Sequence, residues 1–485
     1  MVFIDGSVVN VALPVLQIEL SATLADAQWV VESYALFLAA LLLVGGSLGD
    51  RFGRRRMFAM GVALFAAASV WCGASRNVHQ LIVARGTQGL GGALLTPGSL
   101  AIISASFRKE QRGRAIGTWS AFSAILAGLG PVVGGWLIDH ASWRWAFWIN
   151  VPLALIVLAI LYWRVPESRD DKAAGGIDWR GALLATVGLG CVVYGLIESP
   201  NLKLSAPRQL GTIGVGAAAL LGFIVTQAYG RAPMMPLSLF RSRTFSGANV
   251  LTLLLYSALS GALFFFPFNL IQVQGYSPTA AGASLLPFIL IMFLLSRWSG
   301  GLVTRYGAKL PLIFGSVISA FGFGLFALPD LGGSYWTTFF PAVLTLGLGM
   351  AVSVAPLTTT VMGAVDVSHA GLASGINNAV SRVAGLLSVA VFGLLLSHSF
   401  DKSLDGRFAT IEISAQAKEE LQLRRAELAA MVIPDSVNNE SRSALKRGVA
   451  ESFVTGFRIV MLTAAALAVA GALTAWMLIE PQLRR

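Results

Sequence analysis

Long apolar segments, each about the length of a membrane-spanning helix, follow one another along almost the whole chain. Apolar residues make up 55% of the 485 residues and charged residues only 12%, a charged share well below that of an ordinary soluble domain. A spanning helix needs about 20 apolar residues, because in lipid its backbone groups can be satisfied only within the helix. The sequence therefore predicts an all-helical, polytopic membrane protein. Fourteen spans are predicted, near residues 1–16, 28–48, 57–75, 81–105, 115–138, 145–163, 180–198, 209–228, 246–269, 280–303, 310–328, 335–362, 371–397 and 456–480.

The formal charge of +11 does not indicate nucleic acid binding, because the basic residues form short clusters between apolar segments rather than one surface. Loops on one side of the predicted membrane are rich in arginine and lysine. The short loops on the other side hold only Arg76, Arg144, Lys203 and Arg208. Since basic loops stay in the cytoplasm, the sequence predicts that both termini lie in the cytoplasm.

A basic turn occurs twice in the chain. Residues 46–56 read GSLGDRFGRRR, and a degraded copy, GGLVTRYGAKL, stands at residues 300–310. Two related halves of this kind are typical of transporters. The first copy follows the second span and the other follows the tenth, so two extra spans must lie between the halves. We therefore predict two six-helix bundles at residues 1–163 and 246–485, joined by a linker and two inserted helices at 164–245.

The first predicted span is short for a membrane. Sixteen residues of helix cover about 24 Å of a hydrocarbon core that is roughly 30 Å thick. We favour a start codon placed too far downstream over a thinned or tilted first helix.

A long external loop is expected at residues 398–455, which hold eight basic and nine acidic residues and cannot enter lipid. Within it, Ala417, Leu421, Leu428 and Val432 recur at helical spacing and predict a short amphipathic helix. This helix is either a solvated cap or a docking surface for a partner.

The sequence offers no catalytic or metal-binding pattern. Both cysteines, Cys72 and Cys191, lie inside predicted spans, and the four histidines lack the spacing of metal ligands. The glycines that follow Gln88 lie in the middle of a span rather than after a strand, so they indicate helix packing and not a nucleotide site. Without an ATP site or a cofactor, transport would be driven by an ion gradient.

Several motifs resemble one transporter family. GSLGDRFGRRR resembles the loop signature of the major facilitator superfamily. FIDGSVVNVALP at the start, ARGTQG in the fourth span, GLGPVVGG in the fifth and the following SWRWAFWINVP narrow the resemblance to fourteen-span drug:proton antiporters. The resemblance implies a multidrug efflux protein with the proton as its coupling ion.

The loop signature has two interpretations. The resemblance implies a conformational latch in which Asp50 and Arg51 hold the halves together on the cytoplasmic side. Glycines at its turn would allow close helix approach and a sharp bend. Alternatively, the arginines only enforce topology, and both interpretations can hold. The predicted latch residues are Gly46, Asp50, Arg51, Gly53, Arg54 and Arg55.

Arg85 and Gln88 share a helix face, and an arginine inside a membrane is a functional candidate by default. The resemblance implies that Arg85 takes part in proton coupling, and Gln88 is a cavity candidate. The alternative is that Arg85 only hydrogen-bonds the first or fifth span.

The fifth span carries the antiporter motif, whose residues are Gly130, Pro131, Gly134 and Gly135. Small residues and a proline suit a helix that bends or slides during transport. Tight packing alone is the alternative, and the glycine that the family usually has near position 126 is replaced by Leu126.

Embedded acids are the candidates for proton transfer. A carboxyl group in a low-dielectric cavity can load and release a proton near neutral pH. Glu32 is the leading proton carrier, unless it lies at the external water boundary. Asp5 aligns with the acid of the family's first helix. In the second half, Asn378 and Arg382 fall on one face of the thirteenth span and are candidates for a cavity wall.

We therefore expect a proton-coupled exporter of amphipathic, cationic drugs or toxic compounds in the bacterial cytoplasmic (inner) membrane. The alternatives are a narrow exporter of one endogenous metabolite, or a non-transporting sensor or scaffold on the same fold. The expected partners are small lipophilic substrates and the lipid bilayer, with a periplasmic adaptor protein if the source has two membranes.

Overall fold

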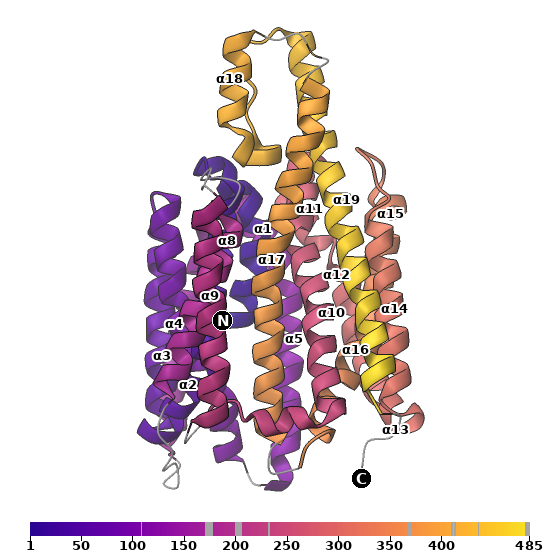
Figure 1. Cartoon of the computed structure of the whole chain (residues 1–485). Helices are drawn as coiled ribbons and strands as arrows, with labels where there is room; N and C mark the ends of the chain where they lie inside the picture. The colour runs from indigo at the N-terminus through magenta and orange to yellow at the C-terminus, as the bar shows by residue number, and fades with distance from the viewer. Residues whose placement is uncertain are drawn as a thin grey trace. The chain divides into compact units, whose positions relative to one another are not determined.

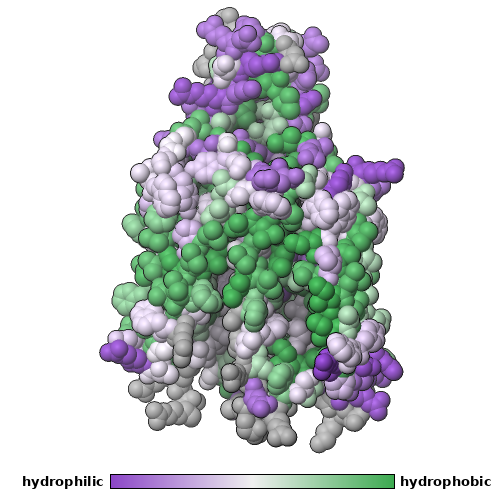
Figure 2. Space-filling view, turned by 180° about the vertical axis from the view of Figure 1, so that it is seen from behind, coloured by the Kyte–Doolittle hydropathy of each residue, from purple (hydrophilic) through white to green (hydrophobic). Residues whose placement is uncertain are grey.

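The computed structural model describes residues 1–480 except 108, 170–177, 199–205, 231–232, 367–369, 409–410, 412–413 and 435. The described residues form helices and connecting segments and include no strand. Twelve of the helical segments are long and apolar enough to cross a membrane. The middle parts of the helices carry apolar side chains on the surface, while polar side chains gather near the helix ends (Figure 2). The prediction of an all-helical, polytopic membrane protein is confirmed.

The chain divides into two compact units (Figure 1). The first unit comprises residues 1–12, 29–195 and 206–238, and the second comprises residues 13–28, 196–205 and 239–485. Helices α1 and α2 therefore contribute to both units. The helices that begin before residue 238 are α1 (Val2–Glu19), α2 (Leu24–Phe52), α3 (Arg54–Ala74), α4 (Val78–Ser106), α5 (Lys109–His140), α6 (Trp145–Trp148), α7 (Asn150–Arg164), α8 (Trp179–Ile197), α9 (Ala206–Tyr229) and the 3₁₀ helix η1 (Leu237–Arg241).

The later helices continue the second unit. They are α10 (Arg243–Phe268), the π-helical turn η2 (Asn269–Val273), α11 (Pro278–Ala283), α12 (Leu286–Gly300), α13 (Leu302–Tyr306), α14 (Lys309–Phe326), α15 (Tyr335–Thr338), α16 (Phe340–Gly363), α17 (Ala370–Phe408), α18 (Ala415–Leu423), the 3₁₀ helix η4 (Arg425–Ala430) and α19 (Asn439–Leu478).

Glycines bring neighbouring helices into close contact in both units. A side chain at Gly61 of α3 would meet the backbone N of Leu95 at 2.8 Å, and one at Gly45 of α2 would meet the backbone O of Ala93 at 2.0 Å. In the second unit, a side chain at Gly315 of α14 would lie 2.2 Å from Ser353 Oγ on α16. Small residues drive helix association in lipid because they let backbones approach closely.

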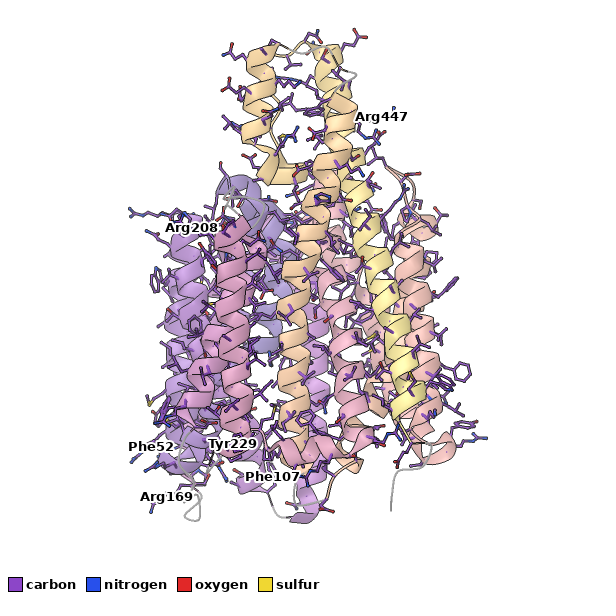
Figure 3. The ribbon with its side chains drawn as sticks, in the orientation of Figure 1. Phe52, Phe107, Arg169, Arg208, Tyr229 and Arg447 are labelled. Atoms are coloured by element: carbon purple, nitrogen blue, oxygen red, sulfur yellow. The ribbon has the colours of Figure 1, made fainter. Side chains whose placement is uncertain are left out.

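Helix α9 extends from one end of the first unit to the other (Figure 3). Figure 3 shows Phe52, Arg169 and Tyr229 at one end of this unit and Arg208 at the other. Arg208 lies in the first turn of α9 and Tyr229 is its last residue, so α9 spans the full height of the unit.

The predicted external loop at 398–455 is partly helical. Helix α17 continues to Phe408 and α19 begins at Asn439, so both extend beyond their predicted spans. The predicted amphipathic helix is also only partly correct. Ala417, Leu421 and Leu428 are buried, but Val432 is 57% exposed. Leu428 has a φ of 52° inside η4, so the helical periodicity ends before Val432.

Candidate functional site

A cluster of buried polar side chains lies inside the first unit. We call it the Asp5 cluster, and it consists of Asp5 of α1, Ser69 of α3, Arg85 and Gln88 of α4 and Asn150 of α7. Each of these residues is at most 1% exposed. Because a charged or polar group is costly to bury without partners, the hydrogen bonds of these five residues determine what the site can do.

Asp5 is the acceptor at the centre of the cluster. Its Oδ2 accepts a hydrogen bond from Arg85 Nη1 at 2.6 Å. Its Oδ1 accepts from Gln88 Nε2 at 2.8 Å and from Asn150 Nδ2 at 3.0 Å. The carboxylate is thus paired with a cation and solvated by two amides.

Arg85 is held on several sides at once. It donates from Nε to the backbone O of Val30 at 2.9 Å and from Nη1 to Gln88 Oε1 at 2.6 Å. Its guanidinium carbon lies 4.2 Å from the centre of the Tyr34 ring, a cation–π distance. Arg85 thus hydrogen-bonds α1, α2 and α4 rather than only the first or fifth span, and its part in proton coupling stays a prediction.

Helix α5 packs against α1 next to Asp5. A side chain at Gly130 would lie 1.9 Å from Ser7 Oγ, and one at Gly134 would lie 2.7 Å from Val8 Cγ1. Pro131 stands between them inside α5, and Gly135 is buried. The antiporter motif therefore lets α5 approach the helix that carries the central carboxylate of the cluster.

This contact predicts a compensating pair of substitutions. Gly130→Ala should strongly impair transport and lower Tm, because the new methyl group overlaps Ser7 Oγ. The additional substitution Ser7→Gly should restore much of the transport rate and of Tm, because it removes the overlapping side-chain atoms. The Ile4 carbonyl oxygen, 3.3 Å away, is then the nearest atom to the new methyl group. Thermal unfolding and transport rates of the single and double variants check this. Gly6→Ala is the control, because its methyl group meets nothing within 4 Å. Equal defects in the single and double variants would contradict the prediction.

Glu32 lies in α2 and takes no part in the hydrogen bonds of the Asp5 cluster. It is 1% exposed, and its Oε2 has no hydrogen-bond partner among the described residues. Glu32 follows the first residue of α2 by eight positions, which places it about 12 Å along the helix. The structure therefore places Glu32 in a buried position, and its role as proton carrier stays a prediction.

The loop signature folds as a sharp turn between α2 and α3. Asp50 Oδ1 accepts a hydrogen bond from Arg54 Nε at 2.8 Å, and the guanidinium carbon of Arg51 lies 5.6 Å from the centre of the Phe52 ring. Gly53 has a φ of 109°, a conformation that strongly favours glycine. The latch between the halves stays a prediction, whereas the turn and its local ion pair are observed.

The three glycines of the signature should differ in tolerance. Gly53→Ala combines an unfavourable φ with a methyl group 2.8 Å from the Glu167 carboxyl, whereas a methyl group at Gly49 meets nothing within 4 Å. At Gly46 it would make an ordinary contact of 3.5 Å with Pro97. We expect Gly53→Ala to cost about 1–3 kcal/mol from strain alone and Gly49→Ala to be neutral. Thermal unfolding and transport of the three variants test the order, and a neutral Gly53→Ala would refute it.

In the second unit, the side chain of Asn377 makes a polar contact from α17, whereas the predicted candidates were Asn378 and Arg382. Asn378 is exposed and donates to the Ser374 carbonyl, and Arg382 is partly buried. The neighbouring Asn377 instead donates from Nδ2 to Thr252 Oγ1 at 2.7 Å and to Asn249 Oδ1 at 3.2 Å. The polar face of α17 that packs inside the unit is therefore centred on Asn377 rather than on Asn378.

A cavity of about 760 Å³ lies in the first unit, with walls from α1, α3, α4, α5 and α7. Its volume suits a small molecule. The described residues that line it are largely apolar and include no acid, so they do not explain selection of a cation. The described residues also contain no group of histidine, cysteine and acidic side chains that could hold a metal ion.

Ser69, Asn150 and Glu167 were not among the predicted functional residues. Ser69 and Asn150 are single polar residues in or beside apolar segments, which is a weak but usable signal. Glu167 is one acid among several in the stretch VPESRDD, and nothing in the sequence distinguishes it.

Apolar helices that enclose a buried ion pair define a multi-pass membrane protein, and comparison with known proteins gives its family. Residues 1–389 match the Major Facilitator Superfamily. The chain belongs to this family and is a transporter rather than an enzyme.

Relatives with known roles are similar over most of their length. The tetracenomycin C resistance and export protein of Streptomyces glaucescens is 32% identical over 478 residues, covering 98% of this chain and 88% of the relative. The multidrug resistance protein Stp of Mycobacterium tuberculosis is 31% identical, with 98% and 89% covered. The methylenomycin A resistance protein of Bacillus subtilis is 33% identical, with 86% and 89% covered. These relatives are drug resistance and export proteins of the same family.

Solved structures agree on the fold. An inward-facing bacterial homologue of the human lysosomal transporter Spinster matches with a TM-score of 0.61 at 18% identity, covering 98% of this chain and 94% of that one. An auto-inhibited peptide transporter of the POT family matches with a TM-score of 0.63 at 15% identity, with 98% and 95% covered.

Proposed function

We propose that this protein exports amphipathic, cationic compounds in exchange for protons. The observation that carries the proposal is the contrast between two buried carboxyl groups of the first unit. Asp5 is saturated by Arg85, Gln88 and Asn150, whereas Oε2 of Glu32 has no partner in the described part of the chain. The names of the export and resistance relatives support a drug-like substrate.

Glu32 is the proposed exchange site. A buried carboxylate without a partner is costly, and either a proton or a cationic substrate would remove that cost. Because the proton and the cationic substrate bind the same carboxyl group, they compete for it. Each conformational change that carries Glu32 across the transport cycle therefore moves either a proton or a substrate. This competition is a direct physical basis for antiport.

Asp5 and Arg85 have a different proposed role. Their opposite charges cancel inside the first unit, so the pair sets the local electrostatics without binding a substrate. Protonation of Asp5 would release the Arg85 guanidinium from its carboxylate partner, which would couple proton binding to the packing of α1 against α4. No bound cofactor is needed for this scheme.

We also propose fourteen spans, with α4 and α5 added to the twelve segments that qualify by length and composition. Both are continuous helices, of 29 and 32 residues. Helix α4 presents Arg85 and Gln88 to the interior, and α5 packs on α1 through Gly130. In this arrangement α8 and α9 are the inserted pair, and both termini face the cytoplasm of a bacterial inner membrane.

The proposal is tested in everted vesicles that contain the protein and are energised to an acidic interior. A panel of lipophilic cations is added while a pH-sensitive dye reports the gradient. We expect several compounds to discharge it, and vesicles without the protein to show no such discharge. A gradient that no compound discharges would argue against proton-coupled export.

A further inference from the structure

The first turn of α3 is held by a segment that lies more than a hundred residues later in the chain. Glu167 Oε1 accepts a hydrogen bond from the backbone N of Arg55 at 2.9 Å, and its Oε2 accepts from the backbone N of Arg56 at 3.2 Å. The backbone N of Arg54 donates to the Ser168 carbonyl at 2.8 Å. The first N–H groups of a helix have no partner within the helix, and here residues 167–168 supply the partners.

The contact is reciprocal. Arg55 Nη1 donates to the carbonyl of Val165 at 3.1 Å, and Val165 is the C-cap residue directly after α7. An anion at a helix N-terminus and a cation at a helix C-terminus both oppose the helix dipole favourably. Each helix end is therefore capped by a charged side chain from the other segment.

Two features adapt the turn to this arrangement. The missing side chain of Gly53 leaves room for the carboxyl group, since a Cβ there would lie 2.8 Å from Glu167 Oε1. Arg54 joins the capping to the signature, because its Nε donates to Asp50 while its backbone N donates to Ser168. Phe52 and Arg169 accordingly lie at the same end of the first unit (Figure 3).

We propose that Glu167 is a positioning residue of the loop signature. Its carboxylate fixes the start of α3, and with it the Asp50–Arg54 pair, in the arrangement that transport requires. The inference rests on the transport function proposed above. According to this inference, the conformation of the loop signature depends on a residue outside it. That residue, Glu167, lies in the segment between α7 and α8.

Amide hydrogen exchange of the purified full chain tests the capping directly. In Glu167→Ala, a peptide covering the first turn of α3 should exchange about tenfold faster, because two N–H groups lose their acceptors. Glu167→Gln keeps an acceptor oxygen and should lie between that variant and the wild type. Glu440→Ala is the matched control, because Glu440 is an exposed acid in the first turn of α19 and its loss should leave this peptide unchanged.

Transport kinetics in vesicles test the consequence. Glu167→Ala should lower the maximal rate at least about fivefold without changing KM, and Glu167→Gln should recover part of the rate. Unchanged exchange in Glu167→Ala would overturn the proposal, as would faster exchange with an unchanged maximal rate. If the wild type moves no compound, the proposed export function fails, while the exchange comparison still decides whether Glu167 holds α3.

Discussion

Glu32→Gln should abolish the discharge of a pH gradient by lipophilic cations in everted vesicles. Glutamine has nearly the same shape as glutamate, but it can neither load a proton nor carry the negative charge that a cationic substrate would neutralise. The stability of the folded protein should not fall, because the substitution removes the charge of a buried carboxyl group whose Oε2 has no partner among the described residues. Loss of transport with an unchanged or higher Tm is the expected pattern for a residue kept for function.

Two further variants make this result specific. Glu32→Asp keeps the carboxyl group but shortens the side chain by one methylene. It should retain a reduced but measurable discharge of the pH gradient. Glu440→Gln neutralises an exposed acid and should behave as the wild type. Full discharge by Glu32→Gln would move the coupling role to Asp5 or another acid, and a large fall in Tm would indicate a structural role for Glu32.

Arg85→Ala should destabilise the protein by about 3–5 kcal/mol, the usual cost of breaking a buried ion pair. It leaves the Asp5 carboxylate without its cation, and it removes one hydrogen-bond donor each from Gln88 Oε1 and from the Val30 carbonyl. Denaturation in detergent measures the loss, and the vesicle assay should show no transport. Arg76→Ala is the control, since it removes the same charge from an exposed position at the end of α3.

A double variant separates folding from transport. Asp5→Asn with Arg85→Gln leaves no unpaired charge in the cluster, and amides can still hydrogen-bond to one another. We expect it to recover most of the stability lost in Arg85→Ala, because the largest cost is the uncompensated charge. Transport should stay absent, since the pair can no longer respond to a proton. A stable double variant with full transport would show that the ion pair is only structural.

Much of the fold follows from local properties of the sequence. Apolar length and the placement of basic turns predict helices that cross a membrane, because lipid leaves a backbone few alternatives. The intramembrane charges were recognisable for the same reason: Asp5, Glu32 and Arg85 are conspicuous where burial of a charge is costly. The break at Gly53 also has a local cause, the positive φ that the turn requires.

The partners of these residues depend on the tertiary structure. Periodicity identifies a helix face but not its rotation about the axis, so the sequence favoured Asn378, whereas packing brings Asn377 into contact with Asn249 and Thr252. Asn150 reaches Asp5 across 145 positions, and Glu167 reaches Arg55 across 112. The sequence alone determined the membrane class, the helices and the charges that need partners, because these depend on the cost of placing each residue in lipid. Only the tertiary structure decided that Asp5 is saturated while Oε2 of Glu32 is not, because hydrogen bonds depend on which side chains packing brings within about 3 Å of one another.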